Sequence, residues 1–278
     1  MKPLRISSFS DGDAGGNPAG VLIADTLPSP EEMQRVAAEL GFSETAFAAP
    51  DGDAWRVRYY APIGEVAFCG HATIALGAAL GDRAGEGRFA LNLRDTAITV
   101  DAYQRDGAWH AALNSPGTWS KPMPDALFYA LLDAFSLDED DIDRALPPRL
   151  AFAGVQHGII ALNDRDTLGR MAYPFDPMRD LMAMHGLTTV TLLYIDGPRA
   201  FSTRNAFASG GVVEDPATGA AAAALGGALV DLDWDGLRQG GRFEVRQGVD
   251  MGMPSTLVVD VTGTPGASVR VSGTVRWM

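Results

Sequence analysis

The chain has 278 residues, 22 of them basic and 35 acidic, which gives a formal net charge of −13, and it contains one cysteine. This length suits one large domain or two smaller ones. A single cysteine excludes an intramolecular disulfide and a cysteine-rich zinc site. The acidic charge argues against nucleic acids and anionic membrane surfaces as partners. Because residues 1–13 carry no apolar signal-peptide segment, a cytoplasmic protein is expected.

In the first half, short strands are predicted at 4–9 and 19–24, joined by a loop rich in glycine and aspartate. Ser29 and Pro30 predict a helix start, because serine caps a helix and proline suits its first position. Gly41 predicts the end of that helix. A buried helix of small residues is expected over 70–81. Further strands are predicted at 43–49, 54–61, 87–93, 96–103 and 108–113, with hairpin turns at Asp51-Gly52 and Asp106-Gly107.

Asn114 to Gly117 is predicted to be a boundary, followed by an irregular stretch. Its acidic cluster, Asp138 to Asp143, is typical of a solvated helix start or loop. Later elements follow the pattern of the first half: strands at 150–155, 158–163, 188–195, 199–207, 242–247, 255–261 and 268–276, and helices at 165–172, 176–185 and 217–232. We therefore expect domains at 1–114 and 115–278, with a last strand that can return to the first domain.

Two helices of small residues match each other without a gap. Glu65–Leu80 aligns with Glu214–Leu229 at a constant offset of 149 residues, with Glu, Gly, Ala and Leu identities along it. Two Ala/Gly-rich helices can match by composition alone, but the matched glutamates and glycines favour duplication. A helix that is thin and apolar all round is typical of one enclosed by a sheet. The fold predicted is α+β, with two pseudo-symmetric domains, each a curved antiparallel or mixed sheet around a central helix.

Each of these helix starts presents backbone N–H groups and the positive end of a helix dipole. If two related domains face each other, both starts meet at one cleft. We therefore expect the segments Gly70-His71-Ala72 and Gly219-Ala220-Ala221 to bind a small carboxylate or other anion. Glycine at each start lets a ligand approach the backbone closely.

The sequence contains no nucleotide-binding, zinc-protease or serine-hydrolase motif. Its four histidines lack metal-ligand spacing, so no metal site is expected. Cys69 and His71 are two residues apart and would not face each other within a helix, which argues against a Cys–His nucleophile. The chemistry that the sequence still allows is proton transfer by carboxylate and imidazole groups.

Three titratable residues are candidates for that chemistry. Glu44, within a small and apolar strand, is either an outward-facing carboxylate or a general base partly removed from water. His71 is either an interior histidine or an acid/base group at a helix start. Asp215 is either a turn or capping residue or a catalytic carboxylate. The catalytic alternatives gain weight because His71 and Asp215 both flank the repeated helix starts.

Four motifs, GGNPAG (15–20), FSETAF (42–47), AFCGHATIALGAAL (67–80) and EDPATGAA (214–221), occur in order along both halves. Together they resemble the PhzF-like isomerases and epimerases of phenazine biosynthesis, which share the diaminopimelate-epimerase fold. The resemblance implies a cofactor-free active site between two domains of a homodimeric enzyme. It implies that Glu44 moves a proton on carbon, and that His71 and Asp215 bind substrate and assist. The implied substrate-binding residues are Asn17, Ser43, Gly70, Ala72, Gly219 and Ala220.

Two positions depart from the family pattern. Ala220 stands where members often have serine, so the phenazine-pathway substrate itself is in doubt. Cys69 lies in a CG motif that carries a catalytic thiol in related racemases, but the repeat places Thr218 opposite it. A two-thiol racemase is therefore excluded, and Cys69 is expected to be a small buried side chain. A 1,3-proton shift is simpler than epimerisation; the rival readings are a non-catalytic anion-binding protein and a thiol enzyme using Cys69.

Overall fold

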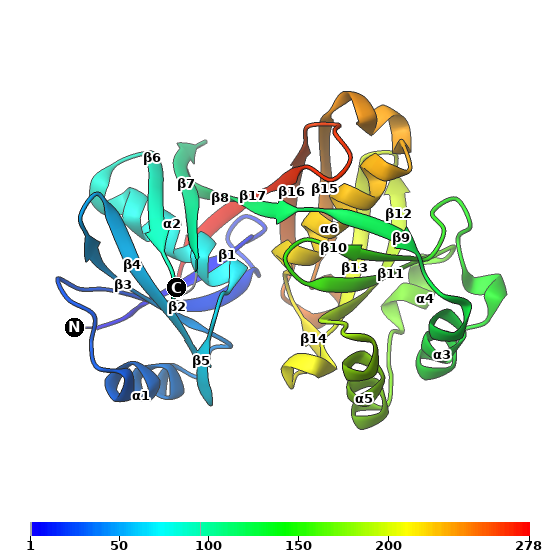
Figure 1. Cartoon of the computed structure of the whole chain (residues 1–278), viewed down its shortest axis with the longest axis horizontal. Helices are drawn as coiled ribbons and strands as arrows, with labels where there is room; N and C mark the ends of the chain where they lie inside the picture. Colours follow the sequence, from blue (N-terminus) through cyan, green and yellow to red (C-terminus); the bar gives the residue numbers. More distant parts are fainter. Residues whose placement is uncertain (1, 95) are drawn as a thin grey trace. The chain divides into compact units, whose positions relative to one another are not determined.

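The computed structural model describes residues 2–94 and 96–278, and the chain forms two compact units (Figure 1). The first unit is Met1–Asn114 with Ser272–Met278, and the second is Ser115–Val271. Strands β8 (Ala108–Gly117) and β17 (Ser268–Trp277) each cross a boundary between them. The two units divide between Asn114 and Ser115, inside the predicted boundary segment 114–117, and that segment is part of strand β8. Its Ser115 hydroxyl accepts a hydrogen bond from the backbone N–H of Val269.

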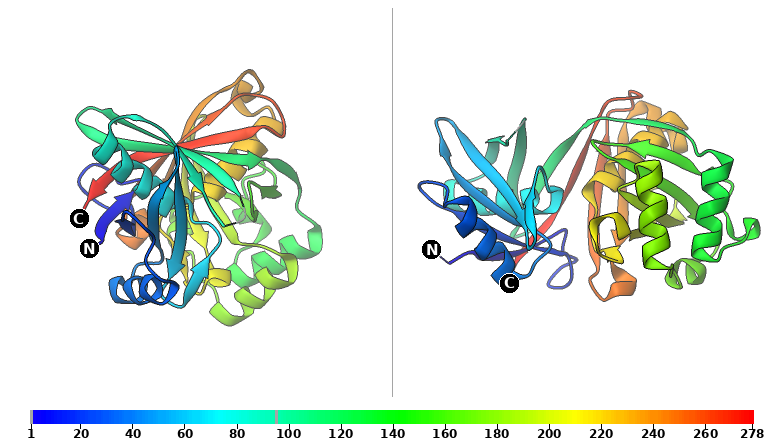
Figure 2. Two further views of the ribbon diagram at one scale, coloured as in Figure 1. Left: turned by 60° about the vertical axis from the view of Figure 1, so that its left-hand side comes forward. Right: turned by 60° about the horizontal axis from the view of Figure 1, so that its bottom comes forward.

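In the first unit, helix α2 (Gly70–Ala84) is surrounded by strands (Figures 1 and 2). The strands pair in the order β1 (Leu4–Ser8), β2 (Asn17–Ile23), β3 (Thr45–Asp51), β4 (Ala54–Ala61), β6 (Gly87–Asn92), β7 (Ala97–Arg105) and β8. Strand β17 pairs with both β8 and β1, which closes the order into a ring. The short β5 (Gly64–Val66) pairs antiparallel with the end of β4 and precedes α2 in the chain. Every residue of α2 from His71 to Gly81 is buried, as expected for an enclosed helix.

Helix α1 (Pro30–Leu40) packs against β4 through Met33, Val36 and Ala37. Its predicted ends are confirmed. The Ser29 hydroxyl accepts a hydrogen bond from the backbone N–H of Glu32, and Gly41 ends the helix with a φ of 69°. This left-handed conformation is one that glycine adopts without strain.

The second unit places helices on both faces of its sheet. The sheet has the strand order β9 (Trp119–Pro122), β10 (Arg149–Phe152), β11 (Gln156–Leu162), β12 (Thr189–Gly197), β13 (Ala200–Ala206), β15 (Gly241–Gln247) and β16 (Ser255–Val261), with β14 (Glu214–Asp215) on β13. Helix α6 (Gly219–Asp231) packs against β9, β10, β11 and β16. Helices α3 (Asp125–Phe135), α4 (Arg165–Gly169) and α5 (Phe175–His185) cover a separate apolar cluster. Short 3₁₀ segments lie at Glu139–Asp141, Ala208–Gly210, Trp234–Gln239 and Val249–Met251.

Helix α3 corrects the prediction of an irregular stretch after the boundary. Its segment is apolar at most positions, so no clear amphipathic period marks it, yet Leu127, Leu131 and Phe135 lie on one buried stripe. The acidic cluster that follows forms the 3₁₀ segment Glu139–Asp141, mostly exposed and begun by a capping box between Asp138 and Asp141. The prediction of a solvated helix start is confirmed there.

The repeat predicted from two helices extends to the strands around them. In the first unit, the pairs β1–β2, β2–β3, β3–β4, β4–β6 and β6–β7 are antiparallel, parallel, antiparallel, parallel and antiparallel. In the second unit, the pairs β10–β11, β11–β12, β12–β13, β13–β15 and β15–β16 show the same alternation. Helices α2 and α6 begin at the matched Gly70 and Gly219. Composition alone would not produce the same strand order twice, so the structure supports duplication.

Each short hairpin before a central helix carries the same ion pair. Glu65 lies opposite Tyr60, and Arg58, two residues before Tyr60, donates to its carboxylate at 2.6 Å. Glu214 lies opposite Ala206, and Arg204, two residues before Ala206, donates to its carboxylate at 3.0 Å. The ungapped alignment misses the arginines because they precede their glutamates by 7 and 10 residues.

The central helices pack closely against their sheets at two matched glycines, Gly77 and Gly226, and the space for a side chain differs between them. A Cβ at Gly77 would lie 2.4 Å from Val100 Cγ2, whereas one at Gly226 would lie 3.1 Å or more from its neighbours. Gly77→Ala is expected to lower the free energy of unfolding by about 1–3 kcal/mol through overpacking. Gly226→Ala should change it by less than about 1 kcal/mol, because better helix propensity offsets a milder contact. Urea unfolding of both variants measures this, and equal losses would contradict it.

A buried histidine makes the stability of the protein depend on pH. His157 on β11 is fully buried, its Nδ1 lies 2.7 Å from the Thr189 hydroxyl, and its Nε2 has no hydrogen-bond partner. Burial lowers the pKa of His157 to about 3. Between that value and about 6.5, the unfolded chain binds one more proton than the folded chain. The contribution of His157 to the free energy of unfolding is therefore fully present above about pH 6.5. It falls by about 1.4 kcal/mol for each pH unit below that value.

Urea unfolding at pH 7 and pH 5 is the measurement for this prediction. His157→Gln should show a smaller loss between the two pH values than the wild type does, because it has no proton to gain. His185→Gln, at the end of α5, is the control and should keep the wild-type dependence. A pH dependence unchanged in His157→Gln would refute the assignment.

Candidate active site

Glu44 lies immediately before β3, in the connection from α1, rather than inside a strand as predicted. The parallel pairing of β2 and β3 holds its backbone, because the Gly20 N–H donates to the Glu44 carbonyl at 3.1 Å. Its side chain is 20% exposed. The carboxylate is therefore partly removed from water, and Glu44 is not a strand residue.

His71 is in the first turn of α2 and is 8% exposed. Its Nε2 lies 3.4 Å from Glu44 Oε2 and 3.3 Å from the Ser43 hydroxyl. The Ser8 hydroxyl, at the end of β1, donates to the His71 carbonyl at 2.7 Å. Three separate segments thus position one imidazole beside one carboxylate, an arrangement suited to proton transfer.

Cys69 corrects a second prediction, because its thiol does face His71. Its Sγ lies 3.4 Å from His71 Nδ1 and 3.8 Å from Nε2. The rule that residues two apart diverge holds within a helix, but Cys69 is the N-cap and has an extended backbone, with φ −143° and ψ 118°. The thiol is buried, as expected, and it is also part of the site.

Two buried hydroxyls that the sequence analysis did not single out brace the start of α2. The Thr73 hydroxyl donates to the Cys69 carbonyl at 2.6 Å and lies 2.5 Å from the Tyr59 hydroxyl. Burial raises the pKa of Tyr59, so the phenol stays neutral and can donate. A threonine in the buried part of a helix made mostly of alanine, glycine and leucine was the available signal.

The other expected residues of the first unit lie around this point. Asn17 begins β2, is 3% exposed and pairs in register with Ser8, whose hydroxyl holds His71. Gly16 before it has a φ of 80°, and a Cβ there would lie 2.4 Å from the Ser7 hydroxyl oxygen, so the tight loop needs glycine. Gly70 is half-buried. The Ala72 side chain is fully buried, so only its backbone could contact a substrate.

In the second unit, Asp215 rests on a buried polar network. Its Oδ2 accepts a hydrogen bond of 2.5 Å from the Thr218 hydroxyl, so the turn-and-cap alternative describes part of its role. Gln247 Nε2 donates to the Asp215 carbonyl at 2.6 Å and to the Thr218 hydroxyl at 3.0 Å. Gln247 Oε1 accepts from the Thr218 N–H and from Asn205. Gln247 was missed, although it is the polar member of an inward-facing series with Phe243 and Val245.

Gly219 and Ala220, the first residues of α6, are half-buried. The N-caps of α2 and α6 are Cys69 and Thr218, and neither side chain hydrogen-bonds to its helix's backbone N–H groups. Both helices therefore begin at the matched glycine, after an N-cap residue with an extended backbone.

A profile of the family described as phenazine biosynthesis-like protein (PhzC-PhzF) matches residues 6–276. The chain belongs to this family. It is 31% identical over 288 residues to an uncharacterized isomerase from Deinococcus radiodurans, covering 97% of this chain and 90% of that protein. It is 30% identical over 273 residues to trans-2,3-dihydro-3-hydroxyanthranilate isomerase from Pseudomonas fluorescens, covering 96% and 92%. The prediction that the chain is an isomerase of the PhzF family is confirmed.

The fold is likewise that of solved PhzF proteins. The crystal structure of a phenazine biosynthesis protein of the PhzF family from Bacillus anthracis matches with a TM-score of 0.87 at 24% identity, covering 100% of this chain and 98% of the other. Among the described residues of this PhzF-family chain, none of the helices is long and apolar enough to cross a bilayer.

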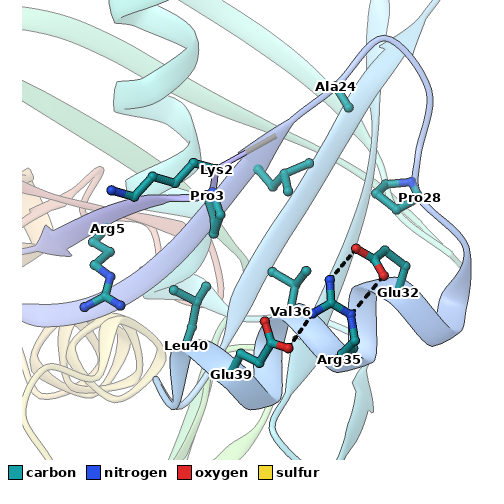
Figure 3. Close-up of a pocket in the computed structure, with 11 residues that line it drawn as sticks. Lys2, Pro3, Arg5, Ala24, Pro28, Glu32, Arg35, Val36, Glu39 and Leu40 are labelled. Carbon is teal, nitrogen blue, oxygen red and sulfur yellow. Dashed lines mark hydrogen bonds and ion pairs between the residues drawn. The ribbon is translucent and has the colours of Figure 1, made fainter.

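One hollow of about 580 Å³ in the first unit of this PhzF-family isomerase is lined by none of the expected site residues (Figure 3). Arg35 is one of the residues that line it and is paired with both Glu32 and Glu39 of the same helix. Arg5, also at its edge, lies over the Phe42 ring. Arg35, the one basic residue of α1, is thus already paired with acidic side chains of its own helix.

Proposed function

We propose that this PhzF-family isomerase moves a proton on carbon of a small carboxylate-bearing metabolite, without a cofactor, and that Glu44 is the acid/base group. The observation that carries the proposal is the 3.4 Å contact between Glu44 Oε2 and His71 Nε2 at the start of α2. A partly buried carboxylate beside an imidazole can take up a proton and return it.

In the proposed reaction, the Glu44 carboxylate removes a proton from a carbon of the substrate. The electron pair of the broken C–H bond shifts into the adjacent unsaturated system, and the Glu44 carboxylic acid then delivers the proton to another carbon. Substrate and product are therefore isomers, and no redox partner is required. His71 orients the carboxylate, and Asp215 assists. One base returning one proton favours a 1,3-shift over epimerisation.

The substrate carboxylate is proposed to bind at the starts of the central helices. Backbone N–H groups at Gly70 and at Gly219–Ala220 offer hydrogen bonds and the positive helix dipole. The name of the Pseudomonas fluorescens relative, trans-2,3-dihydro-3-hydroxyanthranilate isomerase, denotes a substrate of this class. Because Ala220 supplies no hydroxyl, we propose a different substrate for this chain. Ser43 contacts His71, and Asn17, paired in register with Ser8, is proposed to help shape the site.

The domain organisation completes the proposal. We assign the predicted domains 1–114 and 115–278 to the two halves of the duplicated fold, with the end of β17 counted in the first. The cytoplasmic homodimer stays a prediction.

Deuterium exchange tests the proposal. The purified enzyme is incubated in D₂O with trans-2,3-dihydro-3-hydroxyanthranilate and with a panel of small unsaturated carboxylic acids. Deuterium on carbon is then followed by NMR and mass spectrometry. Exchange in at least one substrate, dependent on Glu44, is the expected result. Exchange that survives Glu44→Gln undiminished would show that Glu44 is not the base.

The same assay distinguishes the proposed carboxylate mechanism from a thiol enzyme that uses Cys69. Because the Cys69 thiol touches His71, Cys69→Ala measures whether sulfur does the chemistry. Substantial exchange should remain in Cys69→Ala, since the carboxylate carries the proton. Complete loss in a folded variant would favour the thiol enzyme.

A further inference from the structure

Three side chains of different chemistry converge where α2 begins. Glu44, Cys69 and His71 each place one ligand atom within 4.8 Å of the other two. A carboxylate, a thiolate and an imidazole are the three kinds of protein ligand that zinc binds. The isomerase reaction proposed above uses the carboxylate and the imidazole, and it leaves the thiol without a task.

Two of the separations between the ligand atoms suit a tetrahedral zinc ion. Bond lengths of about 2.0–2.1 Å to nitrogen and oxygen and about 2.3 Å to sulfur imply ligand separations of about 3.4 Å (N to O) and about 3.6 Å (N to S). His71 Nε2 lies 3.4 Å from Glu44 Oε2 and 3.8 Å from Cys69 Sγ. The third separation, between the Glu44 carboxylate and the Cys69 thiol, is within 4.8 Å. Three protein ligands leave the fourth tetrahedral position for water or a ligand, as in open zinc sites.

The surroundings also suit a divalent cation. Cys69 is the N-cap of a helix, where the positive dipole end favours the thiolate form. Thiolate and carboxylate together neutralise two positive charges, and a chain of net charge −13 attracts cations. Hydrogen bonds from Thr73 to the Cys69 carbonyl and from Ser8 to the His71 carbonyl hold both backbones in place. Glu44 is the most open of the three side chains and gives the ion an entry path.

We propose that Glu44, Cys69 and His71 form a zinc-binding site, and that zinc bound there inhibits the isomerase. The ion occupies the carboxylate and imidazole lone pairs that proton transfer requires, so the metal-bound enzyme cannot deprotonate its substrate. Binding itself does not depend on the proposed function, whereas the inhibitory consequence rests on it.

Cobalt(II) is the probe for the site, because a cobalt–thiolate bond has a charge-transfer absorption. Cys69 is the only cysteine in the chain, so this band reports on one position. We expect the full-length reduced protein to bind one Co²⁺ with this band and to release it when Zn²⁺ is added. Cys69→Ala should lack the band, and Glu44→Gln and His71→Gln should each bind Co²⁺ at least about tenfold more weakly. Two matched controls outside the cluster, His185→Gln and Glu39→Gln, should bind as the wild type does.

Absence of the band in the wild type, or unchanged Co²⁺ affinity in Glu44→Gln and His71→Gln, would overturn the zinc site. Inhibition is measured by deuterium exchange, which should be lost at one equivalent of Zn²⁺ and restored by EDTA; full exchange with zinc bound would refute it. Metal binding by a protein without exchange in any substrate would refute the proposed function alone. Exchange without metal binding would refute the zinc site alone.

Discussion

Glu44→Gln is expected to lower kcat for isomerisation by about 10²–10⁴-fold, the usual contribution of a positioned general acid/base group. Glutamine keeps the size of the side chain but cannot accept a proton at neutral pH. The fold should be unaffected, because the structural hydrogen bond at this position, from the Gly20 N–H, goes to the backbone carbonyl. Steady-state kinetics together with the deuterium exchange rate measure the loss.

Three comparisons make this result specific. Glu39→Gln, on the exposed face of α1, should retain full activity. Glu44→Asp should fall between the wild type and Glu44→Gln, because it keeps a carboxylate at a longer distance. The loss should appear in kcat rather than in KM, since the proposed carboxylate-binding groups are elsewhere. A reduction of less than about tenfold, or one confined to KM, would place the base at another residue.

Arg204→Met is expected to lower the free energy of unfolding by about 3–5 kcal/mol, because it leaves a buried carboxylate without its partner. The side chains of Arg204 and Glu214 are 12% and 4% exposed. The guanidinium donates to the Glu214 carboxylate at 3.0 Å and to the Gly169 carbonyl at 2.8 Å. Its hydrogen bonds to Glu214 raise the pKa of Arg204, as expected for a strongly held cation.

The duplicated fold supplies the matched control. Arg58 and Glu65 form the equivalent pair in the first unit, but their side chains are 29% and 21% exposed. Water can replace the lost partner there, so Arg58→Met should lower stability by about 1 kcal/mol or less. The double variant Arg204→Met/Glu214→Leu should regain most of the stability lost in Arg204→Met, because no unpaired charge remains. Urea unfolding measures all three, and equal losses in the two arginine variants would contradict the role of burial.

The central helices and most strands could be predicted from the sequence because their signals are local. Gly70 and Gly219 follow the repeat and begin their helices as predicted, and alternating apolar residues mark strands such as β15 and β16. Helix α3 was not predicted because its apolar residues are not confined to one face of the helix. The strand predicted to begin at residue 43 begins at Thr45, since strand ends depend on pairing partners that are distant in sequence.

The contacts within the site could not be predicted from local sequence patterns. The Cys69–His71 contact depends on the helix beginning one residue after the cysteine, which changes the backbone from helical to extended. The hydrogen bond from Ser8 to His71 joins residues that are 63 apart in sequence. Gln247 supports Asp215 through partners on three separate segments. Residue types and spacing can nominate Glu44, His71 and Asp215, but only tertiary packing decides which atoms meet.

The ring of strands around α2 has a consequence for how the protein is made. Its closing segment, Ser272–Met278, pairs with β1 but is synthesised after the whole of Ser115–Val271. Domains usually fold in the order in which the ribosome releases them. Here the amino-terminal unit must wait, with β1 unpaired on one side, until the later unit has emerged. The ring of strands in the unit that carries Glu44, Cys69 and His71 can therefore close only after Ser115–Val271 has been translated.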